Sequence, residues 1–99
     1  MDFLYRIQPT PPEMLVDDGT PEEQRIVGEH FAHLQRLTAE GVVVLAGRTL
    51  TVGEEGFGII VFRADDEASA RTLMESDPAV AGGVMSAELF PFSLALLGT

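Results

Sequence analysis

Hydrophobic and polar positions alternate along four short stretches of the chain and recur with a helical period along two others. The strand-like stretches are residues 2–8, 42–50, 57–64 and 84–92, and the helical ones are residues 21–40 and 67–76. The order β-α-β-β-α-β contains no internal repeat, and it predicts one domain over residues 1–99. This order is typical of a ferredoxin-like α+β unit, in which an antiparallel sheet carries both helices on one face.

Capping residues give the limits of the first helix. Thr20 offers an N-cap hydroxyl, Pro21 suits the first helical position, and Glu23 completes a capping box. Gly41 ends the helix. The proline-rich stretch 9–19 is predicted to be a loop, which either folds over a neighbouring surface or is a solvated connector.

The strand-like stretches carry more apolar side chains than one covered face requires. In residues 57–64 and 42–46 both alternating sets of side chains are apolar. Two helices cover only one face of a sheet, so the second apolar face needs another partner. A copy of the same chain across a two-fold axis is the simplest one. We therefore expect a homodimer joined through its sheet faces, and we expect the apolar tail after residue 92 to be packed.

Charge and composition exclude several classes of partner. The 99 residues include 16 Asp and Glu against six Lys and Arg, for a formal charge of −10, which repels phosphate backbones and anionic lipid headgroups. No cysteine is present, so disulfides and thiolate zinc sites are excluded. No apolar stretch approaches a membrane span, and the start of the chain is unlike a secretory signal. We expect a cytoplasmic protein that binds neither nucleic acid nor membranes.

Both histidines lie in the first predicted helix, three residues apart. At 100° per residue, His30 falls inside the apolar stripe of the helix and His33 falls at its border. The stripe consists of Val27, Phe31, Leu34 and Leu37, with Ile26 at its edge. His30 is thus either a satisfied core residue or a catalyst. No HExxH-type glutamate or cysteine accompanies the pair, so neither a metal nor another cofactor is predicted.

Asp77 follows the second predicted helix and precedes Pro78. One interpretation is an N-cap for a short turn that begins at Pro78, and the other is a functional carboxylate. The glycines of GEEGFG, residues 53–58, resemble a phosphate-binding loop only loosely. That stretch lacks the following lysine, and its acids would repel phosphate.

Two longer segments resemble the YCII-related (YciI-like) family. HFAHLQRLTAEGVVVLAGRT, residues 30–49, is similar to the first helix and second strand of that family, in which a histidine lies eleven residues before the helix-ending glycine. His30 and Gly41 have this spacing, whereas His33 does not. LMESDPAVAGGVMSAELFPF, residues 73–92, is similar to the Asp-Pro, glycine and terminal Pro-Phe pattern of the family, and it aligns Asp77. The resemblance covers nearly the whole chain.

The resemblance implies a dimeric α/β barrel, made by two ferredoxin-like units that pack sheet to sheet. It also implies a His-Asp active site formed by His30 and Asp77. Arg48 stands where the family usually has proline, in AGR rather than AGP. If this strand end lines the pocket, Arg48 adds a fixed donor that can bind the carboxylate or enolate of a substrate; otherwise Arg48 is a surface salt-bridge partner.

Two functions fit these residues. In the first, the protein is an enzyme in which His30, oriented by Asp77, moves a proton on a small organic molecule during isomerisation, elimination or hydrolysis. In the second, the same pocket belongs to a non-catalytic small-molecule binding or regulatory module. The fold does not choose between them.

Overall fold

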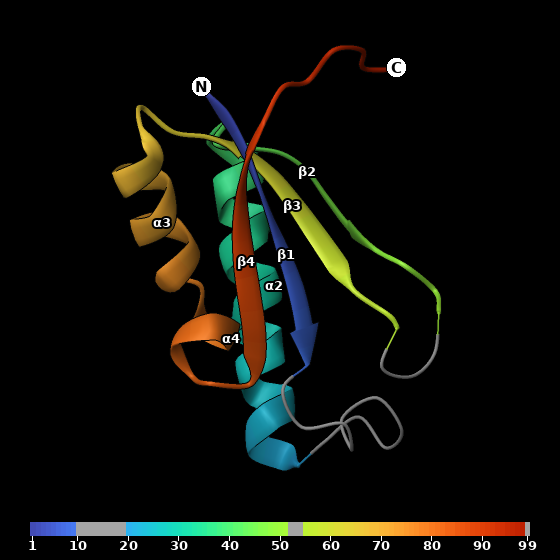
Figure 1. Ribbon diagram of the computed structural model, residues 1–99. Coiled ribbons are helices and arrows are strands. Elements are labelled where there is room, and N and C mark those ends of the chain that lie inside the picture. Colours follow the sequence, from blue (N-terminus) through green and yellow to red (C-terminus); the bar gives the residue numbers. More distant parts are fainter. Residues whose placement is uncertain (10–19, 52–54, 99) are drawn as a thin grey trace.

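The computed structural model describes residues 1–9, 20–51 and 55–98 (Figure 1). The elements are β1 (Asp2–Pro9), α2 (Pro21–Ala39), β2 (Val43–Arg48), β3 (Gly58–Arg63), α3 (Glu67–Glu75), α4 (Pro78–Ala81) and β4 (Met85–Phe92). Most of the loop predicted at residues 9–19 lies outside the described residues. The predicted order of strands and long helices is confirmed, and α4 adds one short turn of helix before the last strand.

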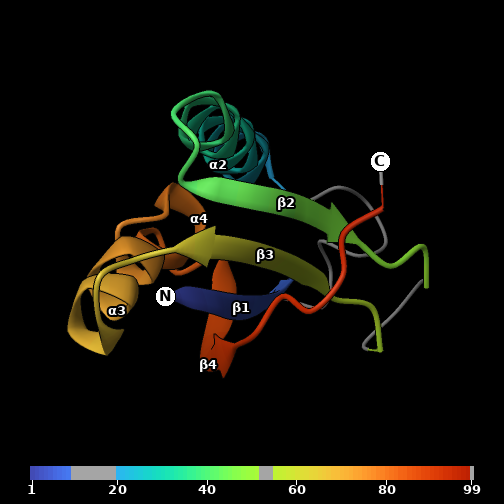
Figure 2. The same ribbon diagram turned by 90° about the horizontal axis from the view of Figure 1, so that it is seen from above.

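The four strands form one antiparallel sheet in the order β2-β3-β1-β4. The two central strands, β1 and β3, are separated in the chain by α2 and β2, which gives the ferredoxin-like connection predicted from the sequence. Figure 2 shows the helices gathered on one side of the sheet. One face of the sheet is therefore covered by helices, and the other face carries none of the helices that the structure describes.

The limits of α2 follow from its capping residues. The Thr20 hydroxyl accepts a hydrogen bond from the Glu23 amide at 3.1 Å, and the Glu23 carboxylate accepts one from the Thr20 amide at 2.8 Å. The predicted capping box is thus present. Gly41 has φ of +80°, the left-handed conformation that glycine adopts without a Cβ penalty. These two ends set the rotation and the length of the helix that carries His30.

The hydrophobic core lies between the sheet and the helices. It is formed by Phe3, Tyr5, Ile7, Leu34, Leu37, Val43, Ile60, Phe62, Ala70 and Met74. The placement of Phe31 in the buried stripe was wrong, because its side chain is 56% exposed. The face that α2 turns to the sheet is centred on His30, Leu34 and Leu37, which leaves Phe31 at the border of a cavity.

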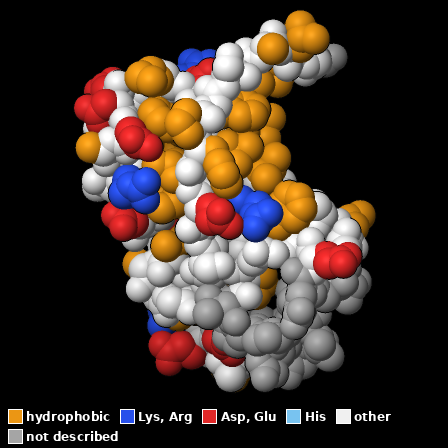
Figure 3. Space-filling view, viewed as in Figure 1, with side chains coloured by type: hydrophobic (Ala, Val, Ile, Leu, Met, Phe, Trp, Pro, Cys, Tyr) orange, Lys and Arg blue, Asp and Glu red, His pale blue; other side chains and the backbone are white. Residues whose placement is uncertain are grey.

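The helix-free face of the sheet is also apolar. Cross-strand pairing aligns Leu45, Val61, Leu4 and Phe90 in one row across all four strands. Val61 lies on a central strand between Leu4 and Leu45, and it is only 2% exposed although none of the described helices covers this face. Figure 3 views this face and shows the hydrophobic side chains gathered over the sheet. The predicted second apolar face is confirmed.

The chain after β4 does not pack as expected. Residues 93–98 have no regular structure, and Leu96 is 92% exposed. Figure 1 shows this segment leaving the body of the molecule beyond the end of β4. Within the described parts of the chain, no helix combines the length and the hydrophobicity that crossing a bilayer requires.

Candidate active site

His30 and Asp77, which are 47 positions apart in the chain, meet beneath α2. The His30 Nδ1 atom lies 2.7 Å from one carboxylate oxygen of Asp77 and 2.9 Å from the other. The Asp77 side chain is fully buried, and that of His30 is 10% exposed. The two side chains that the family resemblance implies for the site are therefore in contact, although only His30 lines the cavity described below.

The position of Asp77 follows from the short helix that it begins. α3 ends at Glu75, and Pro78 starts α4, which packs against α2. Gly82 allows this close approach, because a Cβ atom there would lie 3.0 Å from the Pro78 carbonyl oxygen and 3.3 Å from the Ile26 side chain. Helix packing therefore carries the start of α4, and Asp77 with it, to the buried side of α2.

Asp77 accepts two further hydrogen bonds. The Tyr5 hydroxyl donates to Oδ2 at 2.6 Å, and the Ala79 amide donates to Oδ1 at 2.9 Å. The second of these bonds is the N-cap interaction for α4. The two interpretations of Asp77 are thus compatible, because the same carboxylate caps the short helix and contacts the histidine.

These donors keep Asp77 ionised. Burial by itself would raise the pKa of the Asp77 carboxyl, but the hydrogen bonds from His30, Tyr5 and the Ala79 amide outweigh burial and hold this pKa below its ordinary value. Burial, followed by the negative charge of Asp77 and the hydrogen bond to it, raises the pKa of the Tyr5 phenol, which stays protonated. A carboxylate can only accept, so the proton of neutral His30 resides on Nδ1.

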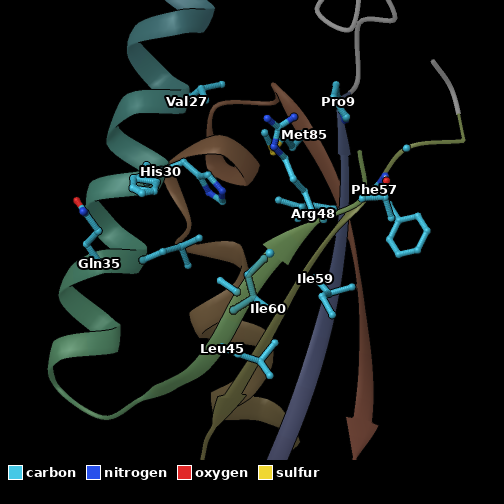
Figure 4. Close-up of a pocket in the computed structure, with 18 of the residues that line it drawn as sticks. Pro9, Val27, His30, Gln35, Leu45, Arg48, Phe57, Ile59, Ile60 and Met85 are labelled. Carbon is cyan, nitrogen blue, oxygen red and sulfur yellow. The ribbon is translucent and has the colours of Figure 1, made fainter. Parts of the chain in front are cut away.

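The imidazole of His30 lines a cavity of about 1360 Å³ between α2 and the sheet. The cavity walls are mostly apolar, and Ile7, Leu34 and Ile60 are among them. Figure 4 shows His30 extending from α2 toward the strands. Within the described residues, Nε2 of His30 has no hydrogen-bond partner, so its lone pair is available to a molecule in the cavity.

Arg48, the last residue of β2, lines the same cavity from the sheet side. Figure 4 shows its side chain extending from the strand into the space that His30 borders. None of the ion pairs formed among residues 1–9, 20–51 and 55–98 includes Arg48. The guanidinium therefore keeps its donors for another partner, and the surface salt-bridge interpretation finds no support in this part of the chain.

His33 lies one turn further along α2 and outside this cavity. Its Nδ1 atom accepts a hydrogen bond from the exposed Arg36 guanidinium at 2.9 Å. Its Nε2 atom is buried, and no partner for it is found in the described chain. Burial, together with the nearby Arg36 and His30, lowers the pKa of His33, although the Asp77 carboxylate opposes this. His33 borders a second, more open depression, which Ser76 and Pro78 also line.

The family model for the YCII-related domain matches residues 1–93 of the chain. The chain belongs to the YCII-related family. Among solved structures, it is similar to 5-chloro-2-hydroxyhydroquinone dehydrochlorinase from Burkholderia phenoliruptrix AC1100, in complex with 2,5-dihydroxybenzoquinone. That match has a TM-score of 0.63 and 18% sequence identity, and it covers 94% of each chain. A comparison with curated proteins gave no match.

A metal centre was not predicted for this YCII-related chain. Over the residues that the structure describes, no group of three or more His, Cys, Asp or Glu side chains is arranged to hold a metal ion. The polar side chains that line the cavity include His30 on the α2 wall and Arg48 on the sheet wall.

Sequence reasoning missed Tyr5, the third side chain of the buried network. The alternation of β1 places Tyr5 on the same face as Phe3 and Ile7, so the sequence indicated only a core aromatic residue. A buried tyrosine hydroxyl needs a polar partner, and this requirement was the available signal. The sequence could not reveal which carboxylate meets that need, because Tyr5 and Asp77 are 72 positions apart.

Proposed function

We propose that this YCII-related protein is an enzyme that moves a proton on a small organic molecule, with His30 as the general acid-base and Asp77 as its orienting partner. The observation that carries the proposal is the 2.7 Å contact between the buried Asp77 carboxylate and His30, which lines a large cavity. A carboxylate partner fixes the imidazole tautomer and stabilises the imidazolium that forms when the ring accepts a proton.

The proton transfer follows from this arrangement. His30 Nε2 accepts a proton from a C–H or O–H bond of a molecule in the cavity, while Nδ1 keeps its hydrogen bond to Asp77. The proton then returns to another atom of the same molecule in an isomerisation, or the substrate carbanion expels a leaving group in an elimination. Water activated by the same base would give hydrolysis.

Arg48 is the proposed substrate-binding residue. Loss of a proton leaves negative charge on the substrate, most readily on an oxygen conjugated with the reacting carbon. A guanidinium donates two hydrogen bonds to such an oxyanion or to a carboxylate. The apolar cavity walls strengthen this interaction, because they lower the local dielectric constant. In a chain of net charge −10, this cation is well suited to hold an anionic ligand.

The structural relative suggests a probe for the cavity. Its name describes a dehydrochlorination, which is an elimination, and it was solved with 2,5-dihydroxybenzoquinone bound. That compound is a small acidic ring with conjugated oxygens, which suits both an imidazole base and a guanidinium. Calorimetric titration with it should detect binding to the wild type. Arg48→Ala should weaken this binding by about tenfold or more, because a charged hydrogen bond is lost.

Arg71→Ala is the matched control, because Arg71 is exposed on α3 and does not line the cavity. Binding that weakens equally in both arginine variants would contradict the proposed role of Arg48.

Catalysis is then separated from binding by following exchange of the ring hydrogens of the compound in deuterated water by NMR. The enzyme should accelerate this exchange, and His30→Gln should abolish the acceleration. Binding without accelerated exchange would favour the non-catalytic binding module.

We also propose that two copies of the chain associate through the helix-free sheet face. The apolar row of Leu45, Val61, Leu4 and Phe90 supports this, since Phe90 is 42% exposed on a single copy and a second copy would cover it. Light scattering should give twice the 10.7 kDa mass of one chain. Phe90→Arg should lower this mass, whereas Ala68→Arg on α3 should not. A wild-type mass of one chain would contradict the dimer.

A further inference from the structure

We propose that Tyr5 is a positioning residue of the His30–Asp77 site, and that its hydroxyl holds the Asp77 carboxylate in the orientation that keeps the His30 proton on Nδ1. The catalytic meaning of this role rests on the proposed function. The positioning itself concerns only the ligand-free protein, so it can be tested whether or not the cavity binds a substrate.

Three elements supply the donors around Asp77. Oδ1 accepts from the Ala79 amide of α4, Oδ2 accepts from the Tyr5 hydroxyl of β1, and both oxygens lie within 2.9 Å of His30 Nδ1 on α2. The carboxylate is fully buried, so bulk water does not compete for its lone pairs. One donor at each oxygen therefore fixes the carboxylate plane, and His30 completes the set.

Tyr5 is itself held rigidly. It lies in the middle of β1, where it is paired with Ile60 of β3 and Leu89 of β4. Its fully buried ring packs edge-on against Phe62, with ring centroids 5.6 Å apart. The hydroxyl therefore approaches Asp77 from a fixed point on the sheet, whereas the Ala79 amide belongs to the short helix that Asp77 begins.

This hydrogen bond has a consequence for the proton on His30. The titratable groups that face Asp77 are Tyr5 on β1 and His30 and His33 on α2, and the Ala79 amide faces it from α4. Without the Tyr5 donor, burial favours a protonated carboxyl, and the proton available to it is the one on His30 Nδ1. When that proton moves to Asp77, Nε2 takes up one proton from solvent, so the ring stays neutral with its proton on Nε2 and no longer presents a base to the cavity.

Tyr5 does not line the cavity, so its effect on a ligand is indirect. Removing its hydroxyl leaves every cavity wall in place. This property separates Tyr5 from Arg48, whose loss removes a donor from the cavity itself.

The direct test is Tyr5→Phe, which removes the hydroxyl and keeps the packed ring. Nitrogen-15 NMR of the imidazoles should show His30 protonated on Nδ1 in the wild type and a mixture of tautomers in the variant. Carbon-13 NMR should show the Asp77 carboxyl titrating at higher pH in the variant than in the wild type. Thr72→Val is the matched control, since it removes a hydroxyl that bonds only the Ala68 carbonyl on α3. Unchanged tautomer and titration in Tyr5→Phe, or equal changes in Thr72→Val, would overturn the proposal.

A second measurement needs no variant and tests the buried, protonated hydroxyl on which the proposal depends if Tyr5→Phe does not fold. Tyr5 is the single tyrosine of a chain without tryptophan, so tyrosinate absorbance reports on this hydroxyl alone. In an alkaline titration followed together with circular dichroism, tyrosinate should form only when the protein unfolds. Tyrosinate that forms while the circular dichroism is still native would overturn the proposal. A failure to bind the quinone probe would count against the proposed function without changing either result.

Discussion

The surroundings of His30 and of His33 differ sharply, although both residues lie on α2 and one turn apart. His30 contacts a buried carboxylate and borders the large cavity. His33 contacts an exposed guanidinium and borders a second, more open depression. The residue type and the local helix are the same, so neither accounts for the difference.

Residues from distant parts of the chain create the contrast. β1 contributes Tyr5, and the start of α4 contributes Asp77, and both lie on the side of α2 that faces the sheet. Three residues along a helix correspond to a rotation of about 300°, so the two histidine side chains point about 60° apart around the helix axis. This difference is enough to turn His33 toward the border of the face that carries His30. Two histidines within one turn of a helix can therefore have different hydrogen-bond partners and different burial.

Among the variants of the buried site around His30, Asp77→Ala should lower the free energy of unfolding most. It leaves the Tyr5 hydroxyl, the His30 ring and the Ala79 amide without their acceptor, at a cost of about 3–5 kcal/mol in the free energy of unfolding. Urea denaturation measures this loss.

Asp66→Ala is the control for Asp77→Ala, because Asp66 caps α3 through the Ser69 amide in an exposed position. Its loss should cost about 1 kcal/mol. Equal losses in the two variants would mean that Asp77 acts only as a helix cap.

His30→Ala should have the second largest effect. The buried Asp77 carboxylate loses one of its donors, so the free energy of unfolding should fall by about 1–3 kcal/mol. Exchange of the ring hydrogens of 2,5-dihydroxybenzoquinone should also lose its acceleration. Thermal unfolding and NMR exchange measure the two effects on the same samples. A variant that is as stable as the wild type and still accelerates exchange would remove His30 from the site.

The dependence of the unfolding free energy on pH should also reveal the buried Asp77 carboxylate that contacts His30. The folded pKa of Asp77 lies below its unfolded value, so ionised Asp77 stabilises the fold above an unfolded pKa of about 3.9. This contribution is lost as the pH falls through the folded pKa. The difference in unfolding free energy between the wild type and Asp77→Asn should therefore be largest near neutral pH and shrink in acid. A difference that stays constant over the whole range would contradict the depressed pKa.

His33→Ala should have the smallest effect. The side chain gives up one hydrogen bond from an exposed arginine, and its buried Nε2 has no partner in the described parts of the chain. The change in unfolding free energy should stay within about 0.5 kcal/mol, and the affinity for the quinone probe should be unchanged. Loss of folding or of binding in this variant, with His30→Ala tolerated, would reverse the assignment of the two histidines.

Local patterns were sufficient to predict most of the fold. Thr20, Glu23 and Gly41 act through contacts within a few residues, so the limits of α2 could be predicted from adjacent letters. The alternation of both apolar sets in residues 57–64 likewise predicted the two-faced sheet. The position of Phe31 could not be predicted in this way, because a small rotation of the helix decides whether a border residue is covered.

The site was less accessible to sequence reasoning than the fold. The pairing of His30 with Asp77 came from family spacing, since no local pattern joins two residues 47 positions apart. Tyr5 was indistinguishable from an ordinary core aromatic residue. The apolar tail was expected to be packed because leucine favours burial, yet Leu96 is exposed in the single chain. Each of these features depends on tertiary contacts.

The central claim is that His30, held by Asp77, acts on a molecule in the cavity. A crystal structure of the protein soaked with 2,5-dihydroxybenzoquinone tests this claim most directly. We expect a ligand oxygen or reacting carbon within roughly 2.6–3.2 Å of His30 Nε2, with Nδ1 still bonded to Asp77. A ligand that binds away from His30, or a cavity that stays empty when the compound is saturating, would contradict it.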